Sequence, residues 1–392
     1  MSEFLSNLRL LRRMNWLMLA VICALIAVGV LFIFSATQTR EGAMTQLYQM
    51  QIKWAVAGLA CYLVTTVMDY RKLRDVAWWF YVMAAILLVA VLFFGTRIYG
   101  ARRWLMFLGV GVQPSELGKL AVIMAGASLL SPPAEKFARL PSMGWLFLLA
   151  GIPMLLVMKE PDLGSALVYV PVTLAMLYVA GARSRPLVLL VLSGVVLVTV
   201  VLAAVALPEK LGVTPERQDR FFRALRLSDY QRDRIEVFLQ PGKDPMGAGW
   251  NKRQSEIAVG SGGLAGKGFL KGTQNILGFL PRTVAPTDFI FSVIAEETGF
   301  AGSVVVLGLY GILVVCGLYA AMVARDKLGR VLCVGIVTMI FTHVFVNMAM
   351  TIGLVPIVGI PLPLVSYGGT FMFVTLFALG LIQSVYVRRS GI

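Results

Sequence analysis

One stretch of the chain, from Trp16 to Ser35, reads WLMLAVICALIAVGVLFIFS and contains no charged residue. A helix needs about 20 mostly apolar residues to cross the hydrocarbon core of a bilayer, and this stretch has that length. Nine further apolar stretches follow: Ile52–Met68, Val76–Phe94, Pro114–Leu130, Met143–Met158, Leu163–Ala180, Pro186–Leu207, Phe289–Met322, Val331–Gly353 and Pro363–Val387. The sequence therefore predicts an all-α, polytopic membrane protein with about ten transmembrane helices, in a single membrane domain over residues 1–392.

The composition supports this class. The chain is 58% hydrophobic and 14% charged, with a mean hydropathy of +0.82, whereas roughly a quarter of the residues of a soluble protein are charged. The net charge of +15 does not indicate nucleic acid as a partner, because most basic residues lie in short loops, where they set topology. The four cysteines lie in apolar stretches without metal-binding spacing, and the single histidine, His343, excludes a histidine-based metal site.

The basic residues of the short loops all fall on one side of the membrane if there are ten spans. They are Arg9, Arg12, Arg13, Arg71, Lys72, Arg74, Lys136, Arg139, Arg183, Arg185, Arg325, Lys327, Arg330, Arg388 and Arg389. Short loops rich in Lys and Arg stay cytoplasmic, so both termini are predicted to be cytoplasmic. Residues 208–286, between spans seven and eight, then form one large extracytoplasmic loop, since loops longer than about 60 residues cross largely regardless of charge.

The large loop carries 13 Lys or Arg residues against 8 Asp or Glu residues. It includes the glycine-rich run Gly260–Gly268, whose backbone N–H groups near Lys267 would suit a phosphate. The run is not a Walker A loop, because Ser261 stands where that motif needs glycine and Gly268 where it needs Ser or Thr. A flexible loop without a ligand is the alternative.

Acidic residues occur just before the eighth span and again about two turns into it. Thr287 and Asp288 precede it, either as a helix cap and first-turn acid or with Asp288 as a general base at the outer surface. Glu296 and Glu297 follow about 12 Å deeper along the helix axis. Two adjacent carboxylates in an apolar helix need a polar cavity or a basic partner for at least one of them.

Further polar residues occur within or beside the spans. Glu116 and Lys119 share one helix face in the fourth span, as a structural ion pair or as the lining of a cavity for a charged headgroup. Arg103, just before this span, is either a membrane-surface anchor or part of the same site. Asp162 reads as a turn or cap residue or as a site residue. Residues 361–369 contain two prolines and two glycines and predict non-helical backbone near the membrane surface.

Together these pieces resemble the SEDS family, the polytopic proteins of bacterial elongation and division. The matching strings are Arg103-Trp104-Leu105, Gln113-Pro114-Ser115-Glu116 with Lys119, Glu160-Pro161-Asp162-Leu163-Gly164-Ser165, Gln254-Ser255 with Ile257-Ala258, Gly260–Gly268, Gly272-Thr273-Gln274, Thr287-Asp288-Phe289-Ile290-Phe291, Glu296-Glu297 with Gly299, and Leu362-Pro363 through Gly369. The Gly-Thr-Gln step and Val365-Ser366-Tyr367 are closer to the elongation branch, RodA, than to the division branch, FtsW. Residues 282–286 depart from the family pattern, with Arg282 in place of the usual acid.

The resemblance implies a peptidoglycan glycosyltransferase of the bacterial inner membrane, which polymerises lipid II during elongation beside a class B penicillin-binding protein. Asp288 matches the family's catalytic aspartate. The implied substrate-binding residues are Arg103, Glu116, Lys119, Gln254, Ser255, Lys267, Glu296 and Ser366. Lys or Arg side chains, or a divalent cation such as Mg²⁺ or Mn²⁺, are expected to offset the charge of the leaving diphosphate.

Two other classes of function share some of these features. A transporter or flippase for lipid-linked precursors would need the cavity and the cations but no base. Such transporters often show inverted repeats and broken helices at the midplane, whereas no repeat is evident here and the notable acid lies at the outer surface. A scaffold without chemistry would leave the charges in the membrane unexplained.

The predicted topology can be tested by labelling. Single cysteines placed in the loop 208–286 should react with an impermeant thiol reagent on intact cells, because the loop is predicted to lie outside. Labelling near Arg325 with none in the loop would reverse the orientation.

Overall fold

The computed structural model describes residues 10–38, 46–98, 101–107, 110–131, 140–160, 162–206, 229–239, 247–280 and 284–389. The predicted loop 208–286 therefore lies partly outside the described residues, including the altered stretch at its end. Its bounds, and those of the single membrane domain, stay predictions.

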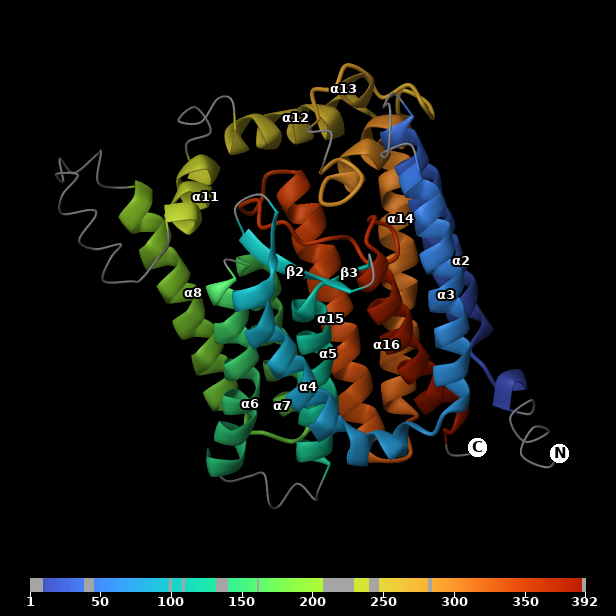
Figure 1. Ribbon diagram of the computed structural model, residues 1–392, viewed down its shortest axis with the longest axis vertical. Coiled ribbons are helices and arrows are strands. Elements are labelled where there is room, and N and C mark those ends of the chain that lie inside the picture. Colours follow the sequence, from blue (N-terminus) through green and yellow to red (C-terminus); the bar gives the residue numbers. More distant parts are fainter. Residues whose placement is uncertain are drawn as a thin grey trace.

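Each of the ten predicted spans corresponds to a helix of an upright bundle (Figure 1). The helices are α2 (Trp16–Thr37), α3 (Leu47–Val67), α4 (Leu73–Phe94), α5 (Pro114–Leu130), α6 (Leu140–Lys159), α7 (Leu163–Val179), α8 (Ser184–Ala206), α14 (Ile290–Met322), α15 (Lys327–Thr351) and α16 (Gly369–Val387). Within the described chain, seven of these are long and apolar enough to cross a membrane. The other three, α5, α6 and α7, are shorter apolar helices or carry charges. The prediction of a polytopic helical membrane protein is confirmed.

A small antiparallel sheet was not predicted. It joins α4 to α5 and consists of β1 (Thr96–Ile98), β2 (Ala101–Phe107) and β3 (Val110–Val112). β1 and β3 have three residues each, and β2, with seven, does not alternate between apolar and polar residues, so only the pairing between them reveals the sheet. Its consequence for the site is that Arg103 lies on a paired strand rather than in an open loop.

Local signals explain several helix ends. Asn15 caps α2 by accepting a hydrogen bond from the Met18 N–H at 3.1 Å, and Pro114 occupies the first turn of α5. The last helix, α16, begins six residues later than the predicted start at Pro363. Residues 352–368 are not helical. The prediction of non-helical backbone for residues 361–369 is confirmed up to residue 368, and the interruption begins earlier than predicted, at residue 352.

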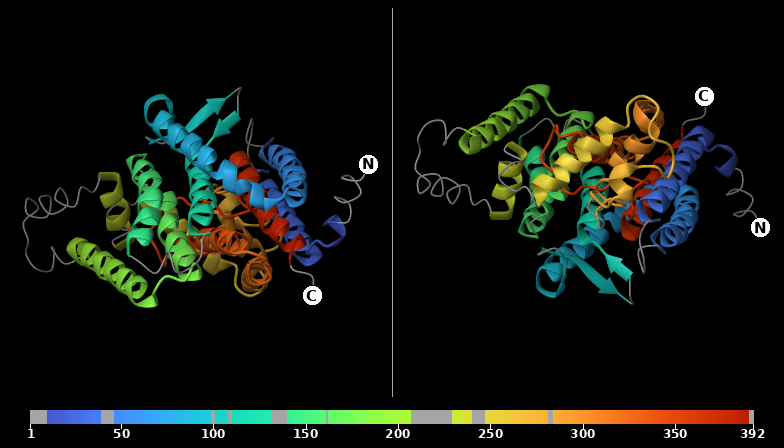
Figure 2. Two further views of the ribbon diagram at one scale, coloured as in Figure 1. Left: turned by 90° about the horizontal axis from the view of Figure 1, so that it is seen from below. Right: turned by 90° about the horizontal axis from the view of Figure 1, so that it is seen from above.

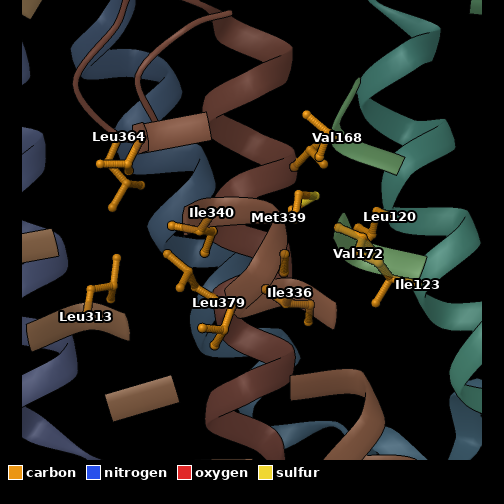
Figure 3. Close-up of a cluster of buried hydrophobic side chains, with 14 of the residues drawn as sticks. Leu120, Ile123, Val168, Val172, Leu313, Ile336, Met339, Ile340, Leu364 and Leu379 are labelled. Carbon is orange, nitrogen blue, oxygen red and sulfur yellow. The ribbon is translucent and has the colours of Figure 1, made fainter. Parts of the chain in front are cut away.

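Helix α15 lies at the centre of the bundle and packs against α5, α7, α14 and α16. Its buried side chains include Ile336, Met339 and Ile340, which meet residues from these neighbours (Figure 3). Those neighbours are Leu120 and Ile123 of α5, Val168 and Val172 of α7, Leu313 of α14 and Leu379 of α16, with Leu364 from the segment before α16. Most of α15 is buried inside the bundle, and it can therefore carry polar residues to the middle of the protein.

Loops predicted to share one side of the membrane do meet at one end of the bundle. Arg389 donates a hydrogen bond to the carbonyl of Arg13 at 3.2 Å, and Arg71 forms a 3.0 Å ion pair with Asp326 between α14 and α15. The opposite end is crossed by α12 (Ala248–Ser261) and α13 (Thr273–Ile276), as Figure 1 shows, with α11 (Asp229–Leu239) beside α8. Figure 2 shows α12 lying over the bundle when this end is viewed directly.

The glycine-rich run lies against a break in α14. At Gly299 the backbone has φ 69° and ψ −163°, outside the helical range. The N–H groups freed after the break, of Phe300 and Ala301, donate to the carbonyls of Gly263 and Leu264 at 2.8 and 3.1 Å. The run is thus bonded to the helix and does not form a free loop.

Substituting Gly299 with alanine should destabilise the protein by about 1–3 kcal/mol, since this backbone conformation is nearly restricted to glycine. An added Cβ would also lie 2.3 Å from the Gly266 nitrogen. Gly308→Ala, on the same helix but with no atom within 4 Å of the added Cβ, is the control. Thermal unfolding in detergent should show a clear loss for the first variant alone, and equal melting temperatures would contradict the assignment.

Candidate active site

Asp288 lies in a turn just before α14. The main chain of this turn accepts hydrogen bonds from two other segments. Asn347 of α15 donates from Nδ2 to the carbonyls of Asp288 and Ile360 at 2.9 and 2.7 Å. Ser366 donates to the carbonyl of Thr287 at 2.6 Å. The central helix and the non-helical segment before α16 therefore position the turn that carries Asp288.

Asp288 has no role as a helix cap. The residue at the cap position of α14 is Phe289, and no side chain caps the helix there. Thr287 donates its hydroxyl to the carbonyl of Val284 at 3.2 Å. The alternative that Thr287 and Asp288 only cap this helix is thus wrong, because the helix begins two residues later than that arrangement requires.

Charged side chains from three other segments surround Asp288. Burial raises the pKa of its carboxyl to about 6, the guanidinium groups of Arg234 and Arg103 oppose this rise, and Asp162 adds to it. Arg234 comes from α11, Arg103 from β2, and Asp162 from the turn before α7. A carboxyl with a pKa just below neutrality is a better proton acceptor than an ordinary aspartate and is still largely ionised at pH 7.

The turn between α6 and α7 connects Arg103 to this group. Arg103 donates from Nε to the main-chain carbonyl of Glu160 at 3.3 Å. Asp162 accepts a hydrogen bond from the Ser165 N–H at 3.1 Å, so it caps α7, as one interpretation of the sequence held. Its carboxylate serves the helix and also contributes to the field at Asp288.

A second polar group lies within the bundle, where Lys119 contacts Glu116 at 2.7 Å and His343 Nε2 at 2.9 Å. All three side chains are buried. A lysine ammonium can only donate, so Nε2 of His343 accepts, and its Nδ1–H donates to the carbonyl of Pro361 at 3.4 Å. His343 and Asn347 lie one turn apart on α15, and both bond to other segments of the chain. The cavity role of Glu116 and Lys119 stays a prediction.

Lys267 and Glu296 are brought together as a 2.7 Å ion pair. The prediction that one of the two adjacent glutamates has a basic partner is confirmed. The backbone N–H groups of Lys267 and Gly268 donate to the carbonyls of Glu296 and Glu297, both at 3.0 Å. These donors are used to attach the glycine-rich run to α14 and do not form an open phosphate nest. The substrate-binding roles of Lys267 and Glu296 stay predictions beside this structural one.

The predicted residues of α12 are also placed inside the protein. Ser255 contacts the hydroxyl of Ser292 at 2.7 Å and donates to the carbonyl of Thr351 at 2.8 Å, which ties α12 to α14 and α15. Gln254 is buried beside it. A direct contact of either residue with substrate stays a prediction.

The sequence did not single out Arg234 or Glu160 as site residues. Arg234 is one of 13 basic residues in the large loop, and nothing local distinguishes it from the others. Glu160 was named only within the matching string of residues 160–165, without a role. Both become apparent through the fold, since their neighbours come from distant parts of the chain.

Comparisons with known proteins cover almost the whole chain. The family model FtsW/RodA/SpoVE, described as a cell cycle protein, matches residues 15–391. The chain is 37% identical over 376 residues to the peptidoglycan glycosyltransferase MrdB of Escherichia coli strain K12, covering 95% of this chain and 93% of that one. It is 33% identical over 433 residues to the peptidoglycan glycosyltransferase RodA of Treponema pallidum strain Nichols, covering 96% and 98%.

Two solved structures are also similar to this chain over almost its whole length. A chain of a peptidoglycan synthase complex, studied for its coordination of polymerization and crosslinking, matches with a TM-score of 0.73 at 28% identity, covering 95% of this chain and 97% of that one. The rod shape determining protein RodA of Thermus thermophilus matches with a TM-score of 0.66 at 27% identity, covering 96% and 98%.

Replacing Lys119 alone with leucine should destabilise the protein by about 3–5 kcal/mol, because Glu116 would keep a buried charge without its partner. Replacing both residues with leucine should cost far less, since two apolar side chains of similar volume remove both charges. Unfolding of the two variants in detergent measures the difference. A double variant as unstable as the single one would contradict a buried ion pair.

Proposed function

This chain belongs to the FtsW/RodA/SpoVE family, the SEDS proteins, and from that premise we propose that Asp288 is the general base with which it polymerises lipid II. The protein is a peptidoglycan glycosyltransferase, and its likeness to MrdB and RodA fits the elongation of the cell wall. The observation that carries the catalytic assignment is the position of Asp288. It has no capping role, it lies in a turn held by Asn347 and Ser366, and it has cationic neighbours.

The reaction is a single displacement with inversion. Asp288 accepts the proton of the 4-hydroxyl of the acceptor GlcNAc, and the oxygen forms a bond to C1 of the donor MurNAc. The bond between C1 and the diphosphate oxygen breaks, and its electron pair leaves with the diphosphate. Asp288 then returns the proton to water. A pKa of about 6 suits this role, because the carboxylate predominates at neutral pH while its basicity exceeds that of an exposed aspartate.

The charge of the leaving diphosphate needs cations near the site. Arg103 and Arg234 lie close enough to Asp288 to affect its pKa, and we assign them to this task. A resident divalent cation fits less well, since the described residues contain no group of three or more His, Cys, Asp or Glu side chains that could hold one. No step is routed through such an ion. A cation that enters together with the substrate's diphosphate is the alternative.

The partner and the orientation follow from the same premise. A matching chain belongs to a synthase complex that couples polymerization with crosslinking, which supports a class B penicillin-binding protein as the partner here. The gathering of Arg13, Arg71 and Arg389 at one end supports a cytoplasmic location for that end. Asp288 and α12 would then lie on the outer side of the bacterial inner membrane, where lipid II is polymerised.

The pH dependence of lipid II polymerisation should reflect the ionisation of Asp288. Activity should fall as the pH drops through about 6, because protonation removes the base. Arg234 favours the ionised form, so Arg234→Met should raise the pKa and move the acidic limb of kcat to higher pH. Arg234→Lys keeps the charge and should leave the limb near its original position. If the acidic limb of Arg234→Met lay at the wild-type pH, Arg234 would not act on the pKa of Asp288.

Asp288→Asn should lower lipid II polymerisation by about 10²- to 10⁴-fold, since the amide cannot accept the proton. Its melting temperature should change little, because Asp288 does not cap α14. Asp326→Asn, which weakens the cap of α15 at the other end of the bundle, is the control and should keep its activity. The double leucine variant of Glu116 and Lys119 should fold yet be inactive.

The decisive measurement is turnover of labelled lipid II by purified protein, with and without the penicillin-binding partner. A wild-type rate in folded Asp288→Asn would remove the general base from the mechanism and favour the transporter function.

A further inference from the structure

Glu160 is a buried carboxyl that the mechanism above does not use. It follows the last residue of α6 and is 1% exposed. Within the part of the chain that the structure describes, neither of its carboxyl oxygens has a hydrogen-bond partner. A buried polar group normally has one, and a group without one is a candidate for contact with a ligand.

The surroundings of Glu160 do not form an ion pair with it. Arg103 bonds to its main-chain carbonyl and not to its carboxyl oxygens. Asp162 lies two residues further along the chain and repels a negative charge on Glu160. Tyr169 of α7 is the third polar neighbour, and its buried hydroxyl also has no partner among the described residues. Burial, reinforced by Asp162 and opposed by Arg103, raises the pKa of Glu160 to about 9.

The charges of the site also favour a proton on Glu160. Asp288 and Asp162 are balanced by Arg234 and Arg103, the two cations that act on Asp288. An ionised Glu160 would add a negative charge to a site that must accept an anion. A phosphate oxygen only accepts hydrogen bonds, so a carboxylate would repel it, whereas a protonated carboxyl can donate one to it.

We propose that Glu160 works as a neutral acid, donating a hydrogen bond from its protonated carboxyl to a diphosphate oxygen of the lipid-linked substrate. This rests on the proposed function in that the ligand is a polyprenyl diphosphate. The residue takes no part in proton transfer from the acceptor sugar. It binds the diphosphate beside Arg103, and its neutral state keeps that guanidinium from being neutralised by a second nearby carboxylate.

The test compares two variants of similar size by their binding of a polyprenyl diphosphate in detergent. Glu160→Gln is neutral and can donate, so it should bind within roughly twofold of the wild type at neutral pH. Glu160→Leu is neutral but cannot donate, so it should bind roughly tenfold more weakly or worse, as expected for loss of a hydrogen bond to a charged group. Equal weakening in both variants would overturn the proposal, and so would full affinity in Glu160→Leu.

The pH profile separates this role from a merely structural one. Wild-type affinity should fall as the pH rises through about 9, when Glu160 ionises, and Glu160→Gln should lack this alkaline loss. Identical profiles would overturn the proposal. Infrared difference spectra of wild type against Glu160→Gln at neutral pH should contain the C=O band of a protonated carboxylic acid, and a carboxylate band in its place would overturn it as well.

Binding without turnover keeps this test independent of the general base. The measurements can be repeated in the Asp288→Asn background, where the Gln and Leu variants of Glu160 should keep their order of affinity. Activity remaining in Asp288→Asn would refute the base and leave the Glu160 result standing. Loss of the order of affinity would refute the Glu160 role and leave the base standing.

Discussion

The cost of placing charge inside an apolar bundle is the constraint on which the structure depends. A charge removed from water needs a partner, a hydrogen-bond network or a proton. Glu116 and Glu296 each have a lysine at 2.7 Å, and Lys119 has His343 as a second partner. Asp288 differs, because its carboxyl is influenced by two guanidinium groups while burial still raises its pKa. The carboxyl proposed to accept the proton is thus held between burial and two cations, which leaves its pKa at about 6.

The central helix α15 connects the polar group around Lys119 with the turn of Asp288. His343 contacts Lys119 within the bundle, and Asn347, one turn further along, holds the turn of Asp288. Both residues also bond to the segment before α16, at Pro361 and Ile360. A displacement of α15 along its axis would therefore change the surroundings of Lys119 and Asp288 together.

At the end of the bundle crossed by α12, hydrogen bonds hold the segments to one another. The break at Gly299 frees backbone groups of α14, and the glycine-rich run supplies their partners. Glu296 fastens the same run through Lys267 and through the N–H of Gln274 at 3.0 Å. The run, interpreted from its composition as a phosphate nest or a flexible loop, is instead part of the scaffold near the site. Glycine is needed there because the two backbones approach too closely for a side chain.

The sequence by itself determined the ten apolar stretches, the interruption of helix at Pro361 and Pro363, and the place of Asp288 just before a span. These features are local, since apolar length, proline and the start of a helix act over a few neighbouring residues. The match of motifs to the SEDS family also came from the sequence alone, and the comparisons confirmed the family.

Only the tertiary structure decided which residues surround Asp288 and which charges neutralise each other. Lys119 and His343 are 224 residues apart in the sequence, and Asn347 and Asp288 are 59 apart. Nothing local distinguishes Arg234 from the other basic residues of the large loop. Glu160 lies in a motif that matches the family, but the sequence does not show that its carboxyl is buried without a partner. Electrostatic energy depends on distance and on burial, and both are set by the packing of helices that the sequence pattern does not order in space.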